Sequence, residues 1–218
     1  MTQSDAVYET MRSLGGYATL GMLNAHVPVA GWGTKTPFAT IRRIVQQDPR
    51  FFKIRPGLWA LTERQAKILK QFDLSATQPE QTKEDFDHYY YQGLLVEIGK
   101  LKNFETFIPY QDKNRLFLQK PLGSVATIEK IPAFTYERVV QRAATIDVTW
   151  FNHRQFPHSF FEVEHSTDFY NSLLKFVELQ DFFARFFVVA DTARKKEFLH
   201  KMNGEAFRAI ANRVDFLS

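Results

Sequence analysis

The chain has 218 residues, 44% hydrophobic and 24% charged, a balance typical of a globular protein with a buried core. It contains no cysteine, which excludes disulfide frameworks, thiolate metal sites and cysteine nucleophiles. No stretch approaches the roughly 18 apolar residues of a membrane helix, and the N-terminus lacks a basic start and an apolar signal core, so we expect a cytoplasmic protein.

The net charge of +4 arises entirely in the first part of the chain. Residues 1–80 hold ten Lys and Arg against six Asp and Glu, whereas residues 81–218 hold 18 of each. A local positive field of this kind suits a polyanion such as nucleic acid, although a solvated basic face gives the same count.

Two helices are predicted near the N-terminus. Ser4 is a candidate cap for the first, which the pair Gly15 and Gly16 would end. A second, short helix is predicted over residues 20–25, after Thr19.

A third helix and a hairpin follow. Thr36 as cap and Pro37 at the first helical position begin the helix. Its predicted apolar face comprises Phe38, Ile41, Ile44 and Val45. Residues 51–54 and 58–61, on either side of a Pro-Gly turn, predict a two-stranded hairpin. Three helices followed by a basic hairpin are typical of a winged helix.

The runs LNAHV and GTKTPFATIRRIVQQDPRFFKIRPGLWALT resemble the HARE-type winged helix-turn-helix family, over residues 3–65. The resemblance implies that the third helix and the wing contact DNA. The residues so implied are Lys35, Arg42, Arg43, Gln46, Gln47, Lys53 and Arg55. The alternative is a winged helix that binds protein and whose basic residues are merely solvated.

A linker is predicted at residues 75–82, which are small and polar and include one proline. It separates a winged helix-turn-helix domain, residues 1–74, from a second domain, residues 83–218. In the second domain a long helix begins at residue 84 and carries Glu97. The apolar patterns then predict strands at 105–111, 144–151 and 160–165, a helix after Thr167 or Asp168, a strand at 186–190 and a helix from Arg194 to the end.

Two of these strands carry acidic residues at apolar positions. Asp147 lies between Ile146 and Val148 in the first strand. Glu162 and Glu164 lie in the second and project from one face, because strand side chains alternate with a period of two. Ionised carboxylates in apolar strands are costly unless a cation compensates them, so three converging acids suggest a divalent metal.

The element order and the spacing D-x14-E-x-E resemble the PD-(D/E)XK nuclease superfamily, to which many restriction endonucleases belong, over residues 84–200. The resemblance implies an α/β fold with a mixed sheet flanked by helices. The catalytic residues it implies are Asp147, Glu162, Glu164 and Glu97, with Mg²⁺ held by Asp147, Glu162 and the carbonyl of Val163. Glu164 stands where most members carry Lys, which leaves three roles open for it: orienting water, acting as general base, or holding a second metal.

We therefore predict a Mg²⁺-dependent DNA endonuclease of the type II restriction class, with double-stranded DNA as its partner and the winged helix aiding site recognition. A homodimer is expected, because cutting both strands of a palindrome takes two active sites related by a two-fold axis. A companion DNA methyltransferase would accompany it. The alternatives are a non-catalytic DNA-binding regulator with a degenerate nuclease fold, and a nuclease specific for modified or branched DNA.

Overall fold

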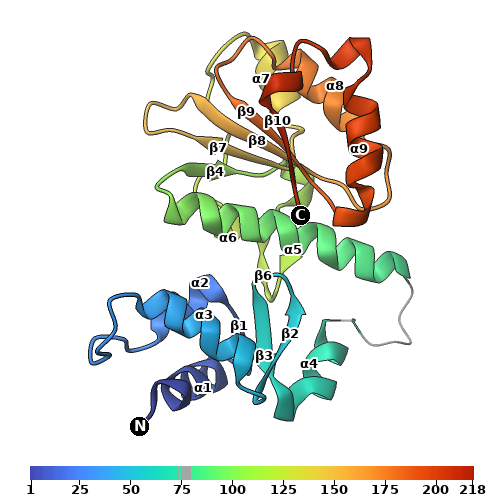
Figure 1. Ribbon diagram of the computed structural model, residues 1–218. Helices are drawn as coiled ribbons and strands as arrows, with labels where there is room; N and C mark the ends of the chain where they lie inside the picture. Colours follow the sequence, from blue (N-terminus) through green and yellow to red (C-terminus); the bar gives the residue numbers. More distant parts are fainter. Residues whose placement is uncertain (73, 75–79) are drawn as a thin grey trace. The chain divides into compact units, whose positions relative to one another are not determined.

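The computed structural model describes residues 1–72, 74 and 80–218. It divides into two compact units, Met1–Pro79 and Glu80–Ser218, each with its own sheet (Figure 1). Of the expected linker, residues 75–79 lie outside the described residues, and residues 80–82 already belong to a helix. Within the described ranges, no helix combines the length and apolar character required to cross a membrane.

The described residues of the first unit form four α-helices, one 3₁₀ turn and three short strands. Its elements are α1 (Gln3–Ser13), β1 (Tyr17–Thr19), α2 (Leu20–His26), α3 (Pro37–Gln47), β2 (Phe51–Arg55), β3 (Leu58–Leu61) and α4 (Gln65–Gln71). The strands form an antiparallel sheet in the order β1-β3-β2. The three helices and the hairpin lie close to the positions expected from the sequence, whereas β1 was not expected.

The cap of α1 differs from the expectation. Thr2, rather than Ser4, caps the helix, since its hydroxyl accepts from the Asp5 N–H while the Asp5 carboxylate accepts from the Thr2 N–H. This reciprocal pair satisfies two amide donors that would otherwise lack partners. Ser4 instead donates to Asp48 at the end of α3.

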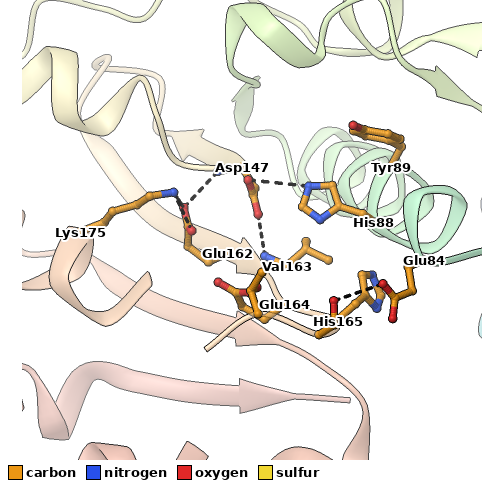
Figure 2. Close-up of a pocket in the computed structure, with 11 residues that line it drawn as sticks. Glu84, His88, Tyr89, Asp147, Glu162, Val163, Glu164, His165 and Lys175 are labelled. Carbon is orange, nitrogen blue, oxygen red and sulfur yellow. Dashed lines mark hydrogen bonds and ion pairs between the residues drawn. The ribbon is translucent and has the colours of Figure 1, made fainter. Parts of the chain in front are cut away.

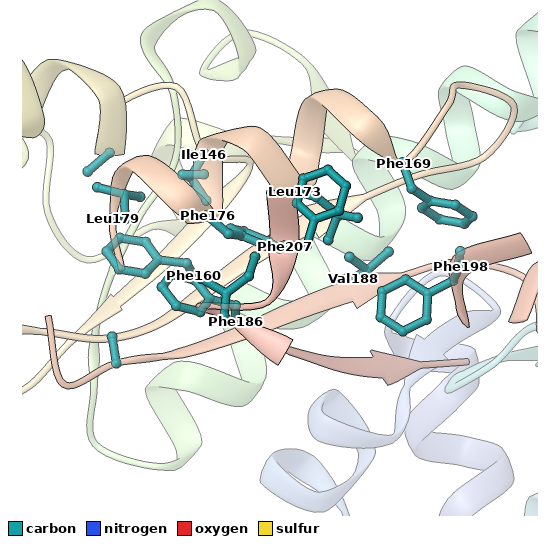
Figure 3. Packing of buried hydrophobic residues seen from close by; sticks show 14 residues of the cluster. Ile146, Phe160, Phe169, Leu173, Phe176, Leu179, Phe186, Val188, Phe198 and Phe207 are labelled. Carbon is teal, nitrogen blue, oxygen red and sulfur yellow. The ribbon is translucent and has the colours of Figure 1, made fainter. Parts of the chain in front are cut away.

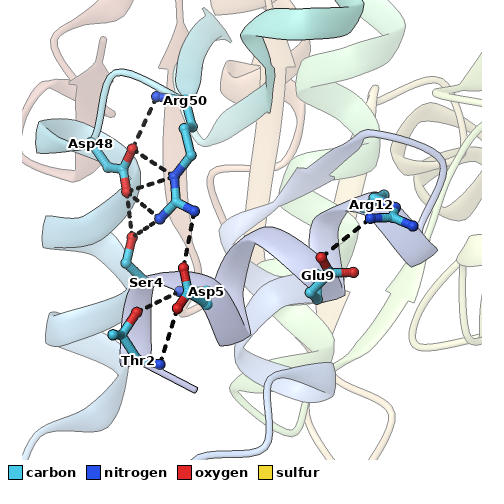
Figure 4. A network of polar contacts seen from close by, with 7 residues as sticks. All are labelled: Thr2, Ser4, Asp5, Glu9, Arg12, Asp48 and Arg50. Carbon is cyan, nitrogen blue, oxygen red and sulfur yellow. Dashed lines mark hydrogen bonds and ion pairs between the residues drawn. The ribbon is translucent and has the colours of Figure 1, made fainter.

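Arg50 joins the start of α1 to the end of α3 (Figure 4). Its guanidinium donates to Asp48 at 2.7 Å, to Asp5 at 3.1 Å and to the Ser4 hydroxyl at 2.7 Å. The hydrogen bonds from Arg50 hold the pKa of Asp48 well below its usual range. Arg50 is therefore engaged within the protein, unlike the exposed basic residues of α3.

The buried stripe of α3 is narrower than its apolar pattern suggested. Ile41 and Val45 are fully buried, but Phe38 is 52% exposed. The positions of Pro37, Ile41 and Val45 are four residues apart and lie along one line of the helix surface. Phe38 lies beside this line and so at the edge of the buried stripe. Thr40, which is not part of the predicted apolar face, is also buried.

The second unit is a mixed sheet flanked by helices, which confirms the α/β class. Its main elements are α5 (Glu80–Leu101), β4 (Glu105–Phe107), β5 (Leu116–Phe117), β6 (Lys120–Pro121), α6 (Leu122–Val125), α7 (Glu137–Ala143), β7 (Val148–Phe151), β8 (Pro157–Val163), α8 (Tyr170–Glu178), β9 (Arg185–Val189), α9 (Lys195–Met202) and β10 (Val214–Leu217). The large sheet has the order β10-β9-β8-β7-β4. Strand β7 runs antiparallel to both of its neighbours, β4 and β8, whereas β8, β9 and β10 are parallel. Helix α5 covers one face, and α7 and α8 lie on the other (Figure 1).

The main core lies between the sheet and α8 (Figure 3). Phe160 of β8 and Phe186 of β9 are register partners, and their rings stack with centroids 5.7 Å apart. Leu173 and Phe176 of α8 are also fully buried in this cluster. The crossover helix between the two parallel strands is thereby fixed against the sheet, which determines where its polar residues lie.

Helix α5 packs very closely against the other face. A Cβ at Gly93 would lie 2.1 Å from Cγ of Phe117, and one at Gly99 would lie 2.5 Å from Cγ2 of Thr106. The Trp150 indole donates to the Leu95 carbonyl at 3.1 Å. The approaches at Gly99 and Leu95 fix the distance of α5 from the large sheet, and the approach at Gly93 fixes it against β5 of the two-stranded sheet.

The C-terminal segment departs from the expected helix. Helix α9 ends at Met202, before Asn203 and Gly204, and residues 214–217 form β10 beside β9. Asn and Gly end helices readily, and the last strand gains backbone hydrogen bonds by extending the sheet. The apolar residues in between still reach the core, on short 3₁₀ turns.

Candidate active site

The predicted acids meet where β7 begins and β8 ends (Figure 2). Asp147 immediately precedes β7 rather than lying inside it. Because β7 and β8 are antiparallel, with Val148 opposite Phe161, the next pair in register is Asp147 opposite Glu162. The strand register alone therefore brings these two carboxylates together.

Backbone hydrogen bonds fix both acids. The Asp147 N–H donates to Oε1 of Glu162 at 3.3 Å, and the Val163 N–H donates to Oδ2 of Asp147 at 2.7 Å. Each carboxylate thus accepts from the strand that carries the other. Backbone amides of the sheet therefore orient both carboxylates.

Helix α8 supplies a cation and a hydroxyl to the two glutamates. Lys175 Nζ lies 2.9 and 2.8 Å from the two oxygens of Glu162. The Ser172 hydroxyl lies 3.0 Å from Glu162 and also contacts Glu164. Since a hydroxyl has one proton, Ser172 can donate to only one of these carboxylates at a time. Thr167 donates to the other oxygen of Glu164.

Burial disfavours the ionised form of the carboxylates at this site. The Glu162 side chain is 3% exposed, against 14% for Asp147 and 23% for Lys175. Burial, followed by the charge of Asp147, raises the pKa of Glu162, and Lys175 opposes this rise. Burial likewise raises the pKa of Asp147, opposed by the Val163 N–H and Lys175. Further positive charge would stabilise both ionised carboxylates.

Helix α5 forms the opposite wall of the pocket. Glu84 and His88, one turn apart, line it, and His88 Nε2 lies 3.9 Å from Oδ1 of Asp147. Burial lowers the pKa of His88. Glu97 lies nine residues after His88, about 180° around the helix, and it does not line the pocket formed by the described residues. The expected acid from this helix is therefore replaced at the pocket by Glu84.

The loop after β8 is held by Arg194. Its guanidinium donates to the carbonyls of His165 at 2.8 Å and Thr167 at 2.6 Å, and it lies 4.2 Å from the ring centre of Phe169. Arg194 thus positions the segment that forms the floor of the pocket. Among the described residues, the lining consists of Glu84, His88, Tyr89, Asp147, Glu162, Val163, Glu164, His165, Ser166, Thr167 and Lys175.

Four of the residues expected at the site, Asp147, Glu162, Val163 and Glu164, line this one pocket. Sequence reasoning missed His88, Ser172 and Lys175. The spacing of Ser172 and Lys175, three apart on a helix with a buried apolar face, was the available signal. The residues expected to bind DNA lie in the first unit: Lys35, Arg42, Arg43, Gln46, Gln47 and Lys53 are exposed, and Arg55 is half-buried.

Comparison with known proteins agrees with this architecture. A family model described as the C-terminal domain of the type II restriction enzyme NmeDI matches residues 69–218. The match covers more than two thirds of the chain and includes the whole mixed sheet and the acidic pocket. Neither the curated proteins nor the solved structures gave a significant match. The chain therefore belongs to the family of the type II restriction enzyme NmeDI C-terminal domain.

Proposed function

We propose that this protein is a metal-dependent DNA endonuclease of the type II restriction class, and that the acidic pocket between β7 and β8 is its active site. The observation that carries the proposal is the pairing of the buried carboxylate of Glu162 with the largely buried Asp147 across adjacent strands, beside a lysine. The family membership supports a restriction-type domain at the same residues.

The strand connections support the PD-(D/E)XK assignment. The order α5-β4-β7-β8-α8-β9 consists of a helix, an antiparallel three-stranded meander, a crossover helix and a parallel strand. Asp147 immediately precedes the second strand of this series and Glu162 lies on the third, which is consistent with that superfamily's motif. The lysine missing at position 164 has a counterpart in Lys175, which approaches from the crossover helix.

The donors fit Mg²⁺. Asp147 and Glu162 offer hard carboxylate oxygens, and the Val163 carbonyl is a third candidate ligand. Lys175 bridges both oxygens of Glu162, which supports a cation at this position. Bound Mg²⁺ would supply a more acidic water and offset the charge that develops on the phosphate.

The protein's own residues then have separable roles. Asp147 and Glu162 hold the cation in the orientation that the strand register imposes. Lys175, 23% exposed at the pocket, would pair with the scissile phosphate when DNA displaces it from Glu162. Glu164, fixed by Ser172 and Thr167, would accept a hydrogen bond from the attacking water and so orient it.

For the first unit we propose DNA binding by a winged helix. Helices α1, α2 and α3 followed by the β2-β3 hairpin support that assignment. Helix α3 exposes Arg42, Arg43, Gln46 and Gln47 on the side away from its buried stripe, and Lys53 is exposed on the hairpin. Such a helix would enter the major groove while the hairpin contacts phosphate. Cleavage of both strands would then require a homodimer.

Plasmid digestion tests the catalytic assignment. Wild-type protein with Mg²⁺ should cut DNA, while Asp147→Asn and Glu162→Gln should each reduce cutting by at least about 10³-fold and still retard DNA in a gel shift. Glu205→Gln is the matched control, because Glu205 is 85% exposed on a turn and pairs with Arg208. Cutting by Asp147→Asn or Glu162→Gln at the wild-type rate would remove the assignment.

The recognition role has its own test. Arg42→Ala with Arg43→Ala should weaken binding and lower the slope of log affinity against log salt by about one unit for each phosphate that the variant no longer neutralises. Arg12→Ala, an exposed arginine on α1 that pairs with Glu9, is the control. An unchanged salt slope in the double variant would argue for a protein-binding winged helix instead.

A further inference from the structure

We propose a second cation site on the α5 side of Asp147, formed by His88, Asp112 and Asp147, which takes a transition-metal divalent ion such as Mn²⁺ or Co²⁺ in preference to Mg²⁺. The three residues come from helix α5, from the 3₁₀ turn Tyr110–Asp112 and from the residue before β7. One ligand atom from each lies within 4.8 Å of the other two. That spacing permits a single ion to contact all three.

Gln92 provides independent support for a ligand here. It lies one turn after His88 on α5 and is fully buried. Its Nε2 lies 3.0 Å from Oδ2 of Asp112 and 3.4 Å from the Asp147 carbonyl, while its Oε1 has no hydrogen-bond partner among the described residues. A buried amide oxygen without a partner is unfavourable.

A cation would give this oxygen a partner. Rotating the Gln92 amide by half a turn places Oε1 where Nε2 now lies, between Asp112 and Asp147. The carbonyl oxygen could then serve as a fourth ligand. Hydrogen-bonding networks assign amide orientation, so a network that includes a cation would favour the rotated form. Asp112, 8% exposed, and Gln92 are buried, whereas the side chains of Asp147 and His88 are 14% and 27% exposed, so an ion could reach the site from the pocket.

The donor set selects the kind of ion. Imidazole nitrogen binds Mn²⁺, Co²⁺ and Zn²⁺ better than it binds Mg²⁺ or Ca²⁺, which prefer oxygen. Replacing one oxygen ligand by His88 therefore shifts the preference toward transition metals. The two aspartates keep the site anionic enough to hold a divalent ion.

This site is adjacent to, and distinct from, the proposed Mg²⁺ position. Oδ2 of Asp147 accepts the Val163 N–H on the β8 side, whereas Oδ1 faces His88 at 3.9 Å. Asp147 would thus bridge two ions, one shared with Glu162 and one shared with His88 and Asp112. The role of the second ion in cleavage rests on the proposed function, but its binding does not.

Titration with Co²⁺ at saturating Mg²⁺ and without DNA tests the site, since the visible absorption of Co²⁺ reports its ligands. The wild type should bind Co²⁺ with a spectrum that includes a nitrogen ligand. His88→Ala and Asp112→Asn should each weaken binding by more than about tenfold, because even loss of a residue that only supports a metal ligand costs roughly 10- to 100-fold. Gln92→Met should also weaken it. Two controls, Glu162→Gln and the exposed His200→Ala, should retain the absorption band.

The outcomes separate the two proposals. Wild-type Co²⁺ affinity in both His88→Ala and Asp112→Asn would overturn the second site even if Glu162→Gln abolished DNA cleavage. Conversely, full cleavage by Glu162→Gln with His88-dependent Co²⁺ binding would overturn only the nuclease assignment. His88→Ala guards against a folding artefact in Asp112→Asn, because the His88 side chain is 27% exposed whereas Asp112 is buried against Gln92.

Discussion

Replacing Lys175 by Met should destabilise the protein in a pH-dependent way. Met keeps most of the apolar stem and removes only the charge that bridges the two oxygens of Glu162. Removing one partner of a buried ion pair costs about 3–5 kcal/mol, because the other charge is left uncompensated. Glu162 is 3% exposed and falls in this class.

Two features reduce the cost. Lys175 is 23% exposed, and Glu162 keeps its hydrogen bonds from Ser172 and the Asp147 N–H. We therefore expect a loss of about 2–3 kcal/mol at pH 8.5, a large share of the roughly 5–15 kcal/mol that stabilises a typical domain.

The pH dependence follows from the pKa of Glu162, which is already raised above its usual range and which Lys175 lowers. Without Lys175 this pKa rises further. An acid with a raised pKa in the folded state loses stability as pH rises through that value, so the loss should shrink to about 1 kcal/mol at pH 5.5. Urea unfolding followed by near-UV circular dichroism at both pH values measures the difference.

A double variant identifies the source of the loss. Adding Glu162→Gln to Lys175→Met removes the unpaired charge. The Gln Oε1 can still accept from the Asp147 N–H, and its Nε2 can donate to the Ser172 hydroxyl, which then donates to Glu164. The double variant should therefore be more stable than Lys175→Met at pH 8.5. Equal losses at the two pH values, or no recovery in the double variant, would refute the electrostatic reasoning.

Two further variants test the pocket and its supporting helix. Asp147→Asn should stabilise the metal-free protein at pH 8 by about 1–2 kcal/mol, because it removes an acid whose pKa is raised by burial. The gain in stability should shrink toward pH 4, where Asp147 is protonated in the wild type. Thermal unfolding in EDTA at both pH values measures it, and a gain that does not depend on pH would contradict the reasoning. Gly93→Ala should destabilise the second unit by about 1–3 kcal/mol despite the better helix propensity of Ala, because the new Cβ would lie 2.1 Å from Phe117. Urea unfolding measures the loss. An unchanged urea midpoint would show that the Phe117 ring moves aside freely.

Local sequence patterns predicted the acids on the strands, because the positions of these acids depend only on one strand and its neighbour. The alternation of residues 160–164 places Glu162 and Glu164 on one face, and the spacing from Asp147 allows one antiparallel pairing. Lys175 could not be found in this way. In the sequence it is one polar residue on an amphipathic helix, and only the packing of α8 on the sheet brings it to Glu162.

Helix α5 shows the same limit. Its buried residues include Tyr90, Gln92, Leu95 and Val96, which point in several directions around the helix, so no single face could be assigned from the pattern. Glu97, flanked by apolar residues, was therefore predicted as the site's acid on this helix. In the structure its position on the helix faces away from the pocket. The C-terminal strand was missed because a helical period of apolar residues continued past the Asn-Gly pair that ends α9.

Arg194 has a consequence for how the protein is made. The carbonyls it holds belong to the loop directly after β8, yet Arg194 itself follows β9 in the chain. A nascent polypeptide that has emerged from the ribosome only as far as α8 contains every acid of the pocket but not the arginine that fixes its floor. The floor of the pocket is thus completed late in synthesis, and on the function that we propose nuclease competence would wait for that step.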